Sequence, residues 1–169
     1  MALQLAGLDG VQNMGNIGDI TTPTSTQLYP LGYTRTFKDV SGTTTQTIEY
    51  IYVQAAAALT QYGVYILAFS NTAGSEWTTG TPASLAVYQN IVVPQVAFTS
   101  GYYGFVAIAG YAKINPASTP TAGHYGTATN GAITATDSAA LTTASFCQFL
   151  SGAASATPCI LIGAKVIIA

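Results

Sequence analysis

The chain has 169 residues and a net charge of −2; only 6% of its residues are charged, whereas 49% are hydrophobic. A typical soluble domain is about 25% charged. This composition argues against intrinsic disorder, and four scattered Lys and Arg residues cannot form the basic surface that nucleic acids or anionic membranes require. A chain of this length is expected to form one domain with a substantial core.

The longest uncharged part of the chain is expected to form strands and not a membrane span. Residues 77–112 carry no charge, but turn-forming residues interrupt them at 79–82, 94–95 and 99–101. A membrane-spanning helix needs about 20 predominantly apolar residues, and no window here supplies them. The first residues include neither a basic segment nor a long apolar one, so we expect no secretory signal and a soluble chain made in a cytoplasm.

Residue types throughout the chain favour β-structure. Thr, Val and Ile are abundant and there are 11 Tyr residues; β-branched and aromatic side chains fit pleated strands better than helices. Only residues 53–59 have the composition of a short helix, and they could equally extend the strand before them. We therefore predict an all-β fold: a small β-barrel or sandwich with an extended N-terminal arm.

Residues 1–36 are predicted to form the arm. Glycines interrupt any regular element in its first half, and Pro23 and Pro30 favour extended backbone. The apolar side chains of an extended arm must be buried against something. Two alternatives remain open: the arm packs on its own domain, or it reaches a neighbouring subunit. The arm residues that we expect at an interface are Leu3, Leu5, Leu8, Ile17, Ile20, Leu28, Tyr29, Tyr33 and Arg35.

Residues 37–169 are predicted to form the β-barrel or sandwich domain, which can be divided into β subregions at 37–100 and 101–169. In the first subregion, one segment alternates so that Tyr50 and Tyr52 share one face. This alternation is typical of a half-exposed strand or of a strand at an interface. We therefore add both tyrosines to the interface candidates.

Further strands are predicted before residue 100. Residues 62–69 form a nearly continuous apolar run of strand length. A longer strand over 83–98 is interrupted by Pro94. Because proline donates no hydrogen bond to the ladder, Pro94 marks an edge, a bulge or a crossing between sheets.

The C-terminal subregion has the clearest strand pattern. Residues 104–114 are apolar on both faces, as expected inside a small barrel. Asn130-Gly131 predicts a tight hairpin turn, because a type I′ turn needs positive φ at both central positions. Residues 145–150 and 158–168 are predicted to form a last pair of strands.

Three segments of this subregion, rich in glycine and strand-forming residues, follow one another before an apolar closing strand. They are Tyr103-Gly-Phe-Val-Ala-Ile-Ala-Gly110, Ala122-Gly-His-Tyr-Gly126 and Thr129-Asn-Gly-Ala-Ile133. On these segments the chain resembles the small β-barrels of decoration proteins of tailed-phage capsids, and as a whole it is most similar to the cement proteins of short-tailed phages. The likeness is strongest over residues 90–169. The extra strands and the arm depart from short decoration proteins and suggest a more intertwined trimer.

The resemblance implies a structural virion protein on the outer surface of the capsid. Proteins of this family are usually homotrimers that clamp neighbouring major capsid proteins, with no catalysis, cofactor or metal. The expected partners are therefore the major capsid protein and further copies of the chain, and neither nucleic acid nor membrane. The scarcity of charge fits this role, because obligate interfaces are apolar, poor in charge and enriched in aromatic residues.

The alternative function is a receptor- or glycan-binding module of a phage tail or head fibre. In that role Trp77 and the tyrosines would stack on the faces of sugars. Aromatic residues exposed in a concave patch around Trp77 would favour glycan binding, whereas aromatic residues buried between subunits would favour a cement protein.

An enzymatic function would depend on the only histidine of the chain. His124, Asp137 and either Cys147 or Cys159 could in principle form a base, an orienting group and a nucleophile. No local signature surrounds either cysteine, and their spacing does not match a zinc motif. We therefore expect His124 to be a turn residue and the chain not to be an enzyme.

The two cysteines could face each other on paired strands. Assembly in a reducing cytoplasm favours free, buried thiols, while a disulfide at a virion surface is the alternative. Of the two, we predict that Cys147 and Cys159 are free thiols in the core.

Overall fold

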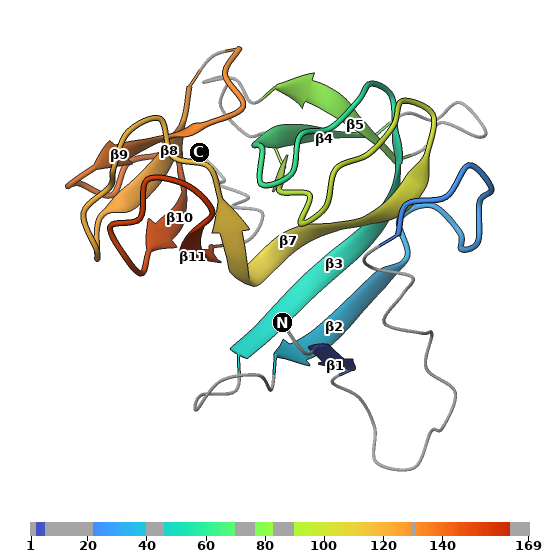
Figure 1. The fold of residues 1–169 in the computed structure, drawn as a ribbon, viewed down its shortest axis with the longest axis horizontal. Coiled ribbons are helices and arrows are strands. Elements are labelled where there is room, and N and C mark those ends of the chain that lie inside the picture. Colours follow the sequence, from blue (N-terminus) through green and yellow to red (C-terminus); the bar gives the residue numbers. More distant parts are fainter. Residues whose placement is uncertain are drawn as a thin grey trace.

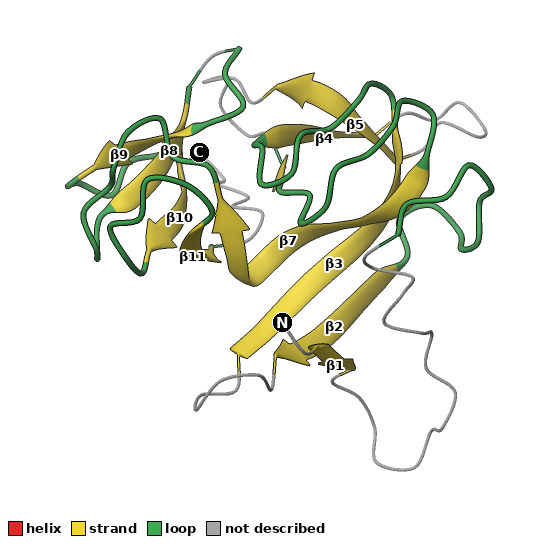
Figure 2. Cartoon of the chain, viewed as in Figure 1, coloured by secondary structure: helices red, strands yellow, loops and turns green. Residues whose placement is uncertain are grey.

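The computed structural model of the chain is built from β-strands (Figure 1, Figure 2). The structure describes residues 3–5, 22–39, 46–69, 77–82, 90–129 and 131–162. Their strands are β1 (Leu3–Leu5), β2 (Thr34–Asp39), β3 (Gln46–Ala55), β4 (Tyr65–Phe69), β5 (Trp77–Pro82), β6 (Ile91–Val92), β7 (Tyr103–Ile114), β8 (Tyr125–Ala128), β9 (Ala135–Ser138), β10 (Ser145–Phe149) and β11 (Thr157–Leu161). Within these ranges there is no helix of the length and apolar character needed to cross a membrane. The predicted all-β class is confirmed.

All of these strands belong to one mixed sheet. Its order is β6-β4-β5-β3-β7-β11-β10-β8-β9, and β2 joins it as a side branch that pairs with β3 and carries β1. The pairing between β3 and β5 is parallel, and the other strand pairings are antiparallel. Across the described residues the two ends, β6 and β9, do not pair with each other. The fold is therefore β-sandwich-like and not the closed barrel that was the other predicted architecture.

The longest strand, β7, runs through both halves of the molecule. Its first part pairs with β3, and its last part, from Gly110 to Ile114, pairs with β11. Figure 1 shows that the strand bends sharply between these two parts. Gly110 has a φ of +80°, and a Cβ atom at this position would overlap with the backbone oxygen of Thr47. Glycine is therefore required at the bend, both for its backbone conformation and for its lack of a side chain.

The bend divides the sheet into two lobes, each of which curls back toward β7. The N-terminal lobe comprises β2 to β6 with the first part of β7, and the C-terminal lobe comprises the last part of β7 with β8 to β11. Val93 exchanges two backbone hydrogen bonds of 2.9 and 3.0 Å with Ala107 of β7. In the C-terminal lobe, the Ala135 N–H donates to the carbonyl of Asn115, which follows β7, at 3.0 Å. This curvature turns one face of each lobe inward.

Two clusters of buried side chains fill the interior. One lies against a single face of β3 and β7 and includes Ile51, Val53 and Val106. The other starts on the opposite face with Tyr50 and Tyr52 and continues into the C-terminal lobe. The prediction of a half-exposed strand is therefore wrong. β3 pairs with β7 on one edge and with β2 and β5 on the other, and one of the two clusters packs on each of its faces, so both faces are buried.

The described part of the predicted arm packs on its own chain. β2 already begins at Thr34, and β1 pairs with it. The N–H of Thr24 donates to the carbonyl of Tyr103 at 2.9 Å, and Tyr29 packs against the core. The arm candidates that lie outside the described residues are Leu8, Ile17 and Ile20.

The hairpin predicted at Asn130-Gly131 forms between β8 and β9 with a longer loop. Strand pairing ends at Ala128 and Ala135, so residues 129–134 make the connection in place of a two-residue turn. Gly131 has a φ of +72°, while Asn130 lies outside the described residues.

The remaining predicted strands differ from the observed ones mainly in length. The strand predicted over 83–98 is reduced, within the described residues, to the two residues of β6. Pro94 follows β6, and its carbonyl accepts a hydrogen bond from the N–H of Tyr62 at 2.8 Å. Residues 53–55 end β3, so the strand alternative holds there. The predicted last pair of strands forms as the antiparallel pair β10 and β11, and residues 163–168 of the second predicted strand lie outside the described residues.

Candidate interaction surface

Four of the predicted interface residues lie close together on the outside of the N-terminal lobe, three of them just before β2 in the sequence and one, Arg35, on β2 itself. Leu28 is 53% exposed and Tyr33 is 40% exposed, although both are large and apolar or aromatic. Tyr29 and Arg35 are half-buried beside them. Exposed large apolar side chains that cluster are typical of binding surfaces.

A tight turn places the two tyrosines side by side. The N–H of Tyr33 donates to the carbonyl of Pro30 at 3.2 Å, and Gly32, the third residue of the turn, has a φ of +81°. A glycine with positive φ at the third position of the turn is the preference of a type II turn. The chain therefore reverses here, and the rings of Tyr29 and Tyr33 stack with their centroids 5.7 Å apart.

Arg35 lies over both stacked rings. Its guanidinium carbon is 4.6 Å from the ring centroid of Tyr29 and 5.1 Å from that of Tyr33. Its Nε donates to the hydroxyl of Tyr33 at 3.3 Å. Cations at this distance from an aromatic face are attracted by the ring quadrupole. The arginine therefore fixes the two tyrosines in place and is itself held by them.

The charge of Arg35 is stabilised by these tyrosines. Desolvation by burial acts to lower the pKa of Arg35, but hydrogen bonding and Coulombic interactions with Tyr33 and Tyr29 outweigh it and raise that pKa above its ordinary value. Its Nη1 atom is buried and has no hydrogen-bond acceptor among the described residues. The aromatic contacts thus supply the main electrostatic compensation for this cation.

A second aromatic pair meets the same turn. Phe69 of β4 is 65% exposed and pairs across the strands with Trp77 of β5, with ring centroids 5.0 Å apart. Trp77 packs over Gly32 so closely that a Cβ atom on Gly32 would overlap with the indole. The turn at Gly32 therefore joins both groups into one surface. We call it the aromatic surface, and its residues are Leu28, Tyr29, Gly32, Tyr33, Arg35, Phe69 and Trp77.

The two predicted interface tyrosines of β3 lie inside the chain, and one of them supports this surface. Tyr50 and Tyr52 are each 1% exposed, so their side chains belong to the core of the chain itself. The hydroxyl of Tyr52 accepts a hydrogen bond from the N–H of Leu28 at 3.0 Å, and its ring packs edge-on against Tyr29. Tyr52 thus holds the surface from inside, and neither tyrosine is itself offered to a partner.

Sequence reasoning missed Phe69 as part of a surface. The residue ends an apolar run, and such a run predicts a buried strand. The available signal was its position: Phe69 is the last residue of β4, where the strand leaves the covered part of the sheet. Trp77 is the predicted sugar-stacking residue of the alternative function, and the structure places it beside Phe69 with part of its ring covered by Gly32.

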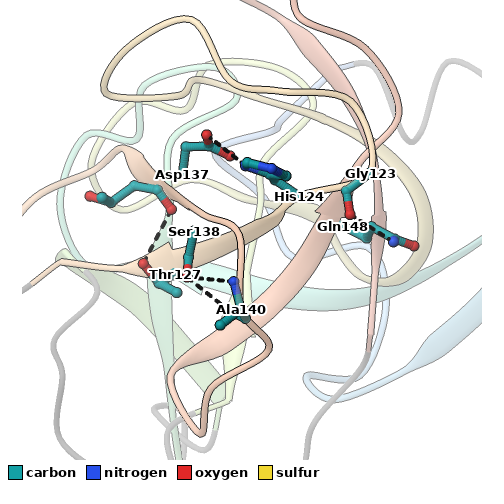
Figure 3. Close-up of polar contacts among 8 residues, drawn as sticks. Gly123, His124, Thr127, Asp137, Ser138, Ala140 and Gln148 are labelled. Carbon is teal, nitrogen blue, oxygen red and sulfur yellow. Dashed lines mark hydrogen bonds and ion pairs between the residues drawn. The ribbon is translucent and has the colours of Figure 1, made fainter.

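His124 and Asp137 are brought together in the C-terminal lobe (Figure 3). His124 precedes β8 and Asp137 lies on the adjacent strand β9, and His124 Nδ1 is 3.0 Å from Asp137 Oδ2. Both side chains are partly exposed. Among the described residues, His124 has no second side-chain partner, so the pair lacks the hydroxyl or thiol that a nucleophilic mechanism needs. As Figure 3 shows, the neighbouring Gln148 donates to the carbonyl of Gly123 at 3.0 Å.

The two cysteines are free and buried, as predicted. They lie on the paired strands β10 and β11, two positions out of direct register. A hydrogen bond with Cys147, followed by desolvation, raises the pKa of the Cys159 thiol. Such thiols are inert, because the thiolate is the reactive form. Within the described ranges, no group of three or more His, Cys, Asp or Glu residues is arranged to hold a metal ion.

No protein-family model matches the chain, and no curated protein matches its sequence.

Proposed function

We propose that the chain is a structural virion protein that binds the outer surface of a phage capsid and stabilises it by clamping neighbouring major capsid proteins. The observation that carries the proposal is the aromatic surface, which combines Trp77, two tyrosines and Arg35 with the exposed Leu28 and Phe69. Trp, Tyr and Arg are the residues most enriched at the energetic centres of protein interfaces.

A clamp needs two contact surfaces, and the C-terminal lobe supplies a second apolar one. Leu150 follows β10, Ile160 lies on β11 and Ile162 follows β11; all three are exposed. Their neighbours Phe149, Cys159 and Leu161 are buried, so alternation along the strands places the exposed side chains on the outer face of the sheet. Two separate apolar surfaces on two lobes suit a protein that bridges neighbouring molecules.

The scarcity of charge agrees with contacts of this type. Fully burying one large apolar side chain is worth about 1.5–3 kcal/mol, so a few such residues on each surface suffice for stable attachment. Few charged residues are available for ion pairs at either surface. We therefore expect capsid binding to depend only weakly on salt concentration.

Binding to purified capsids that lack the chain tests the proposal. We expect the double variant Tyr33→Ser, Phe69→Ser to bind at least about tenfold more weakly in co-sedimentation, a loss of about 1.4 kcal/mol. Leu141→Ser is the matched control, because Leu141 is 54% exposed but lies outside both apolar surfaces. Unchanged capsid occupancy of the double variant, or the same loss in the control, would contradict the proposal.

The second candidate is the glycan- or receptor-binding module, and the exposed Phe69–Trp77 pair is the observation that favours it. A sugar needs a freely accessible ring face on which to stack. Trp77 is half-buried against Gly32, and the ring of Phe69 is tilted 59° to it, so the pair offers no common flat platform. Binding of the chain to host cell surfaces, but not to capsids, would favour this candidate over the first.

A further inference from the structure

Strand β1 is attached to the sheet through one neighbour. Its three residues pair antiparallel with the end of β2, with Leu3 opposite Asp39, Gln4 opposite Lys38 and Leu5 opposite Phe37. Among the described strands, β1 pairs with β2 alone. Figure 1 shows β1 at the far end of the ribbon that β2 and β3 form, away from the strands of the C-terminal lobe.

The edge of β2 is longer than the strand that covers it. β2 has six residues, all paired with β3 on one side, whereas β1 covers only the last three on the other. Among the described residues, Thr34 to Thr36 have no strand on that outer edge. An open strand edge presents backbone donors and acceptors that a further extended chain can pair with.

The connection between β1 and the rest of the chain is long. Residues 6–21 separate β1 from the next described residue and contain four glycines. A segment of this length can reach up to about 50 Å when extended, at roughly 3.3 Å per residue. A folded chain of this size has a radius of gyration of about 15 Å. The connection is therefore long enough for β1 to reach β2 of an adjacent molecule.

We propose that β1 is exchanged between copies of this chain, so that Leu3–Leu5 of one copy pairs with the last three residues of β2 in another. An exchanged β1 makes the same three residue pairs with β2 of another copy that it makes with β2 of its own chain. The exchange therefore costs no pairing energy. The exchange loses the high effective concentration that a connection within one chain gives to β1 and β2. This effective concentration is modest for a long connection, so a high local concentration of the protein can exceed it. The occupant of the β2 edge in the assembled protein is thus a second copy. This inference does not depend on capsid binding.

Disulfide trapping across the β1–β2 pair tests the exchange. Gln4→Cys and Lys38→Cys are made as separate single variants, since Gln4 and Lys38 are direct partners. The two folded variants are mixed, incubated at high concentration and oxidised mildly with glutathione disulfide, with the buried native cysteines left in place. We expect a covalent heterodimer on a non-reducing gel, and its fraction should rise several-fold with protein concentration.

Two control experiments use the same cysteine positions together with a third one, Thr47. A mixture of Gln4→Cys with Thr47→Cys should cross-link only at background level, because Thr47 pairs with Lys38 on the other side of β2. The double variant Lys38→Cys, Thr47→Cys should cross-link within one molecule, which shows that the engineered cysteines form disulfides across this ribbon in the folded chain. Light scattering and circular dichroism confirm that each variant is folded.

The double variant Gln4→Cys, Lys38→Cys distinguishes pairing of β1 within one molecule from its exchange between molecules. Covalent dimers or larger species from this variant support the exchange. Cross-linking only within single molecules at every concentration, together with no heterodimer in the mixture, would overturn it. No cross-link of either kind would overturn it as well, because β1 would then not pair with β2. Capsid binding is measured separately, so failure here leaves the proposed function standing.

Discussion

Gly126 on β8 and Cys147 on β10 are direct partners in the sheet, and a Cβ atom on Gly126 would overlap with the Sγ of Cys147. The thiol therefore fills the space that a side chain at position 126 would need. Phe149 and Ala135 close the same space at 3.2 and 3.3 Å. Close packing of the C-terminal lobe thus depends on a residue without a side chain in the interior of a strand.

Gly126→Ala is expected to destabilise the protein by about 1–3 kcal/mol, because overpacking a close-packed core forces side chains and backbone to move. Urea denaturation followed by circular dichroism measures the change in the free energy of unfolding. Cys147→Ala in the same chain removes the overlapping sulfur, so the double variant should lose less than the two single changes added together. Equal stability of Gly126→Ala and the parent would show that the core has room at this position.

Gly32→Ala should be more damaging than Gly101→Ala. Both glycines have a positive φ, +81° and +82°, so alanine carries a backbone cost of about 1–2 kcal/mol at either position. Gly101 has open space around its Cβ position, whereas a Cβ on Gly32 would overlap with Trp77. Trp77 is the only tryptophan, so its fluorescence emission should shift in Gly32→Ala and remain unchanged in Gly101→Ala. The same emission from both variants would contradict the packing of Trp77 on the turn.

Arg35→Ala is expected to reduce the free energy of unfolding by about 1 kcal/mol, because it removes the cation that lies over Tyr29 and Tyr33. Arg35→Lys keeps the charge but loses the planar group that stacks on both rings, so it should recover only part of the loss. Thermal denaturation of the three proteins side by side measures the order. Full recovery in Arg35→Lys would mean that charge, and not stacking, is the important property.

Cys159 should make the protein less stable at alkaline pH. Its pKa is raised in the folded state, so the folded protein keeps the thiol protonated while the unfolded chain, with a thiol pKa of about 8.5, loses the proton. The stabilisation is therefore complete below about pH 8.5 and decreases as the pH rises toward the folded-state pKa. Cys159→Ala should show a smaller loss of stability between pH 7 and pH 10 than the parent. An identical pH dependence of the two proteins would argue against a buried, protonated thiol.

His124→Ala should leave capsid binding unchanged and cost at most about 1 kcal/mol of stability, because a partly exposed hydrogen bond between two side chains contributes little. Asp137→Asn keeps a hydrogen-bond acceptor beside the imidazole and should cost less than His124→Ala. Co-sedimentation with capsids and urea denaturation measure the two effects. Loss of capsid binding in His124→Ala with stability retained would give this pair a direct role in function.

Local sequence features sufficed for the class of fold. The abundance of β-branched and aromatic residues, the turn residues that cut every apolar run to strand length, and the apolar character of β7, β10 and β11 all act over a few neighbouring residues. The free thiols could also be predicted, because they depend on residue type and redox environment.

The aromatic surface could be predicted only in part. Leu28, Tyr29, Tyr33 and Arg35 are close in sequence, and one turn brings them together. Trp77 and Phe69 join them through strand pairing in another part of the sheet, which no local pattern specifies.

Residue chemistry and short-range patterning thus dictate that this chain forms strands, turns and an apolar, weakly charged surface. Long-range pairing dictates which of its aromatic residues face outward. Tyr50 and Tyr52 have the same alternating pattern that an exposed strand would have, yet they are buried because Phe37, Phe105 and other residues distant in the sequence pack over that face of β3. Strand order is set by contacts between residues far apart in the chain, and those contacts exist only once the whole sheet has formed.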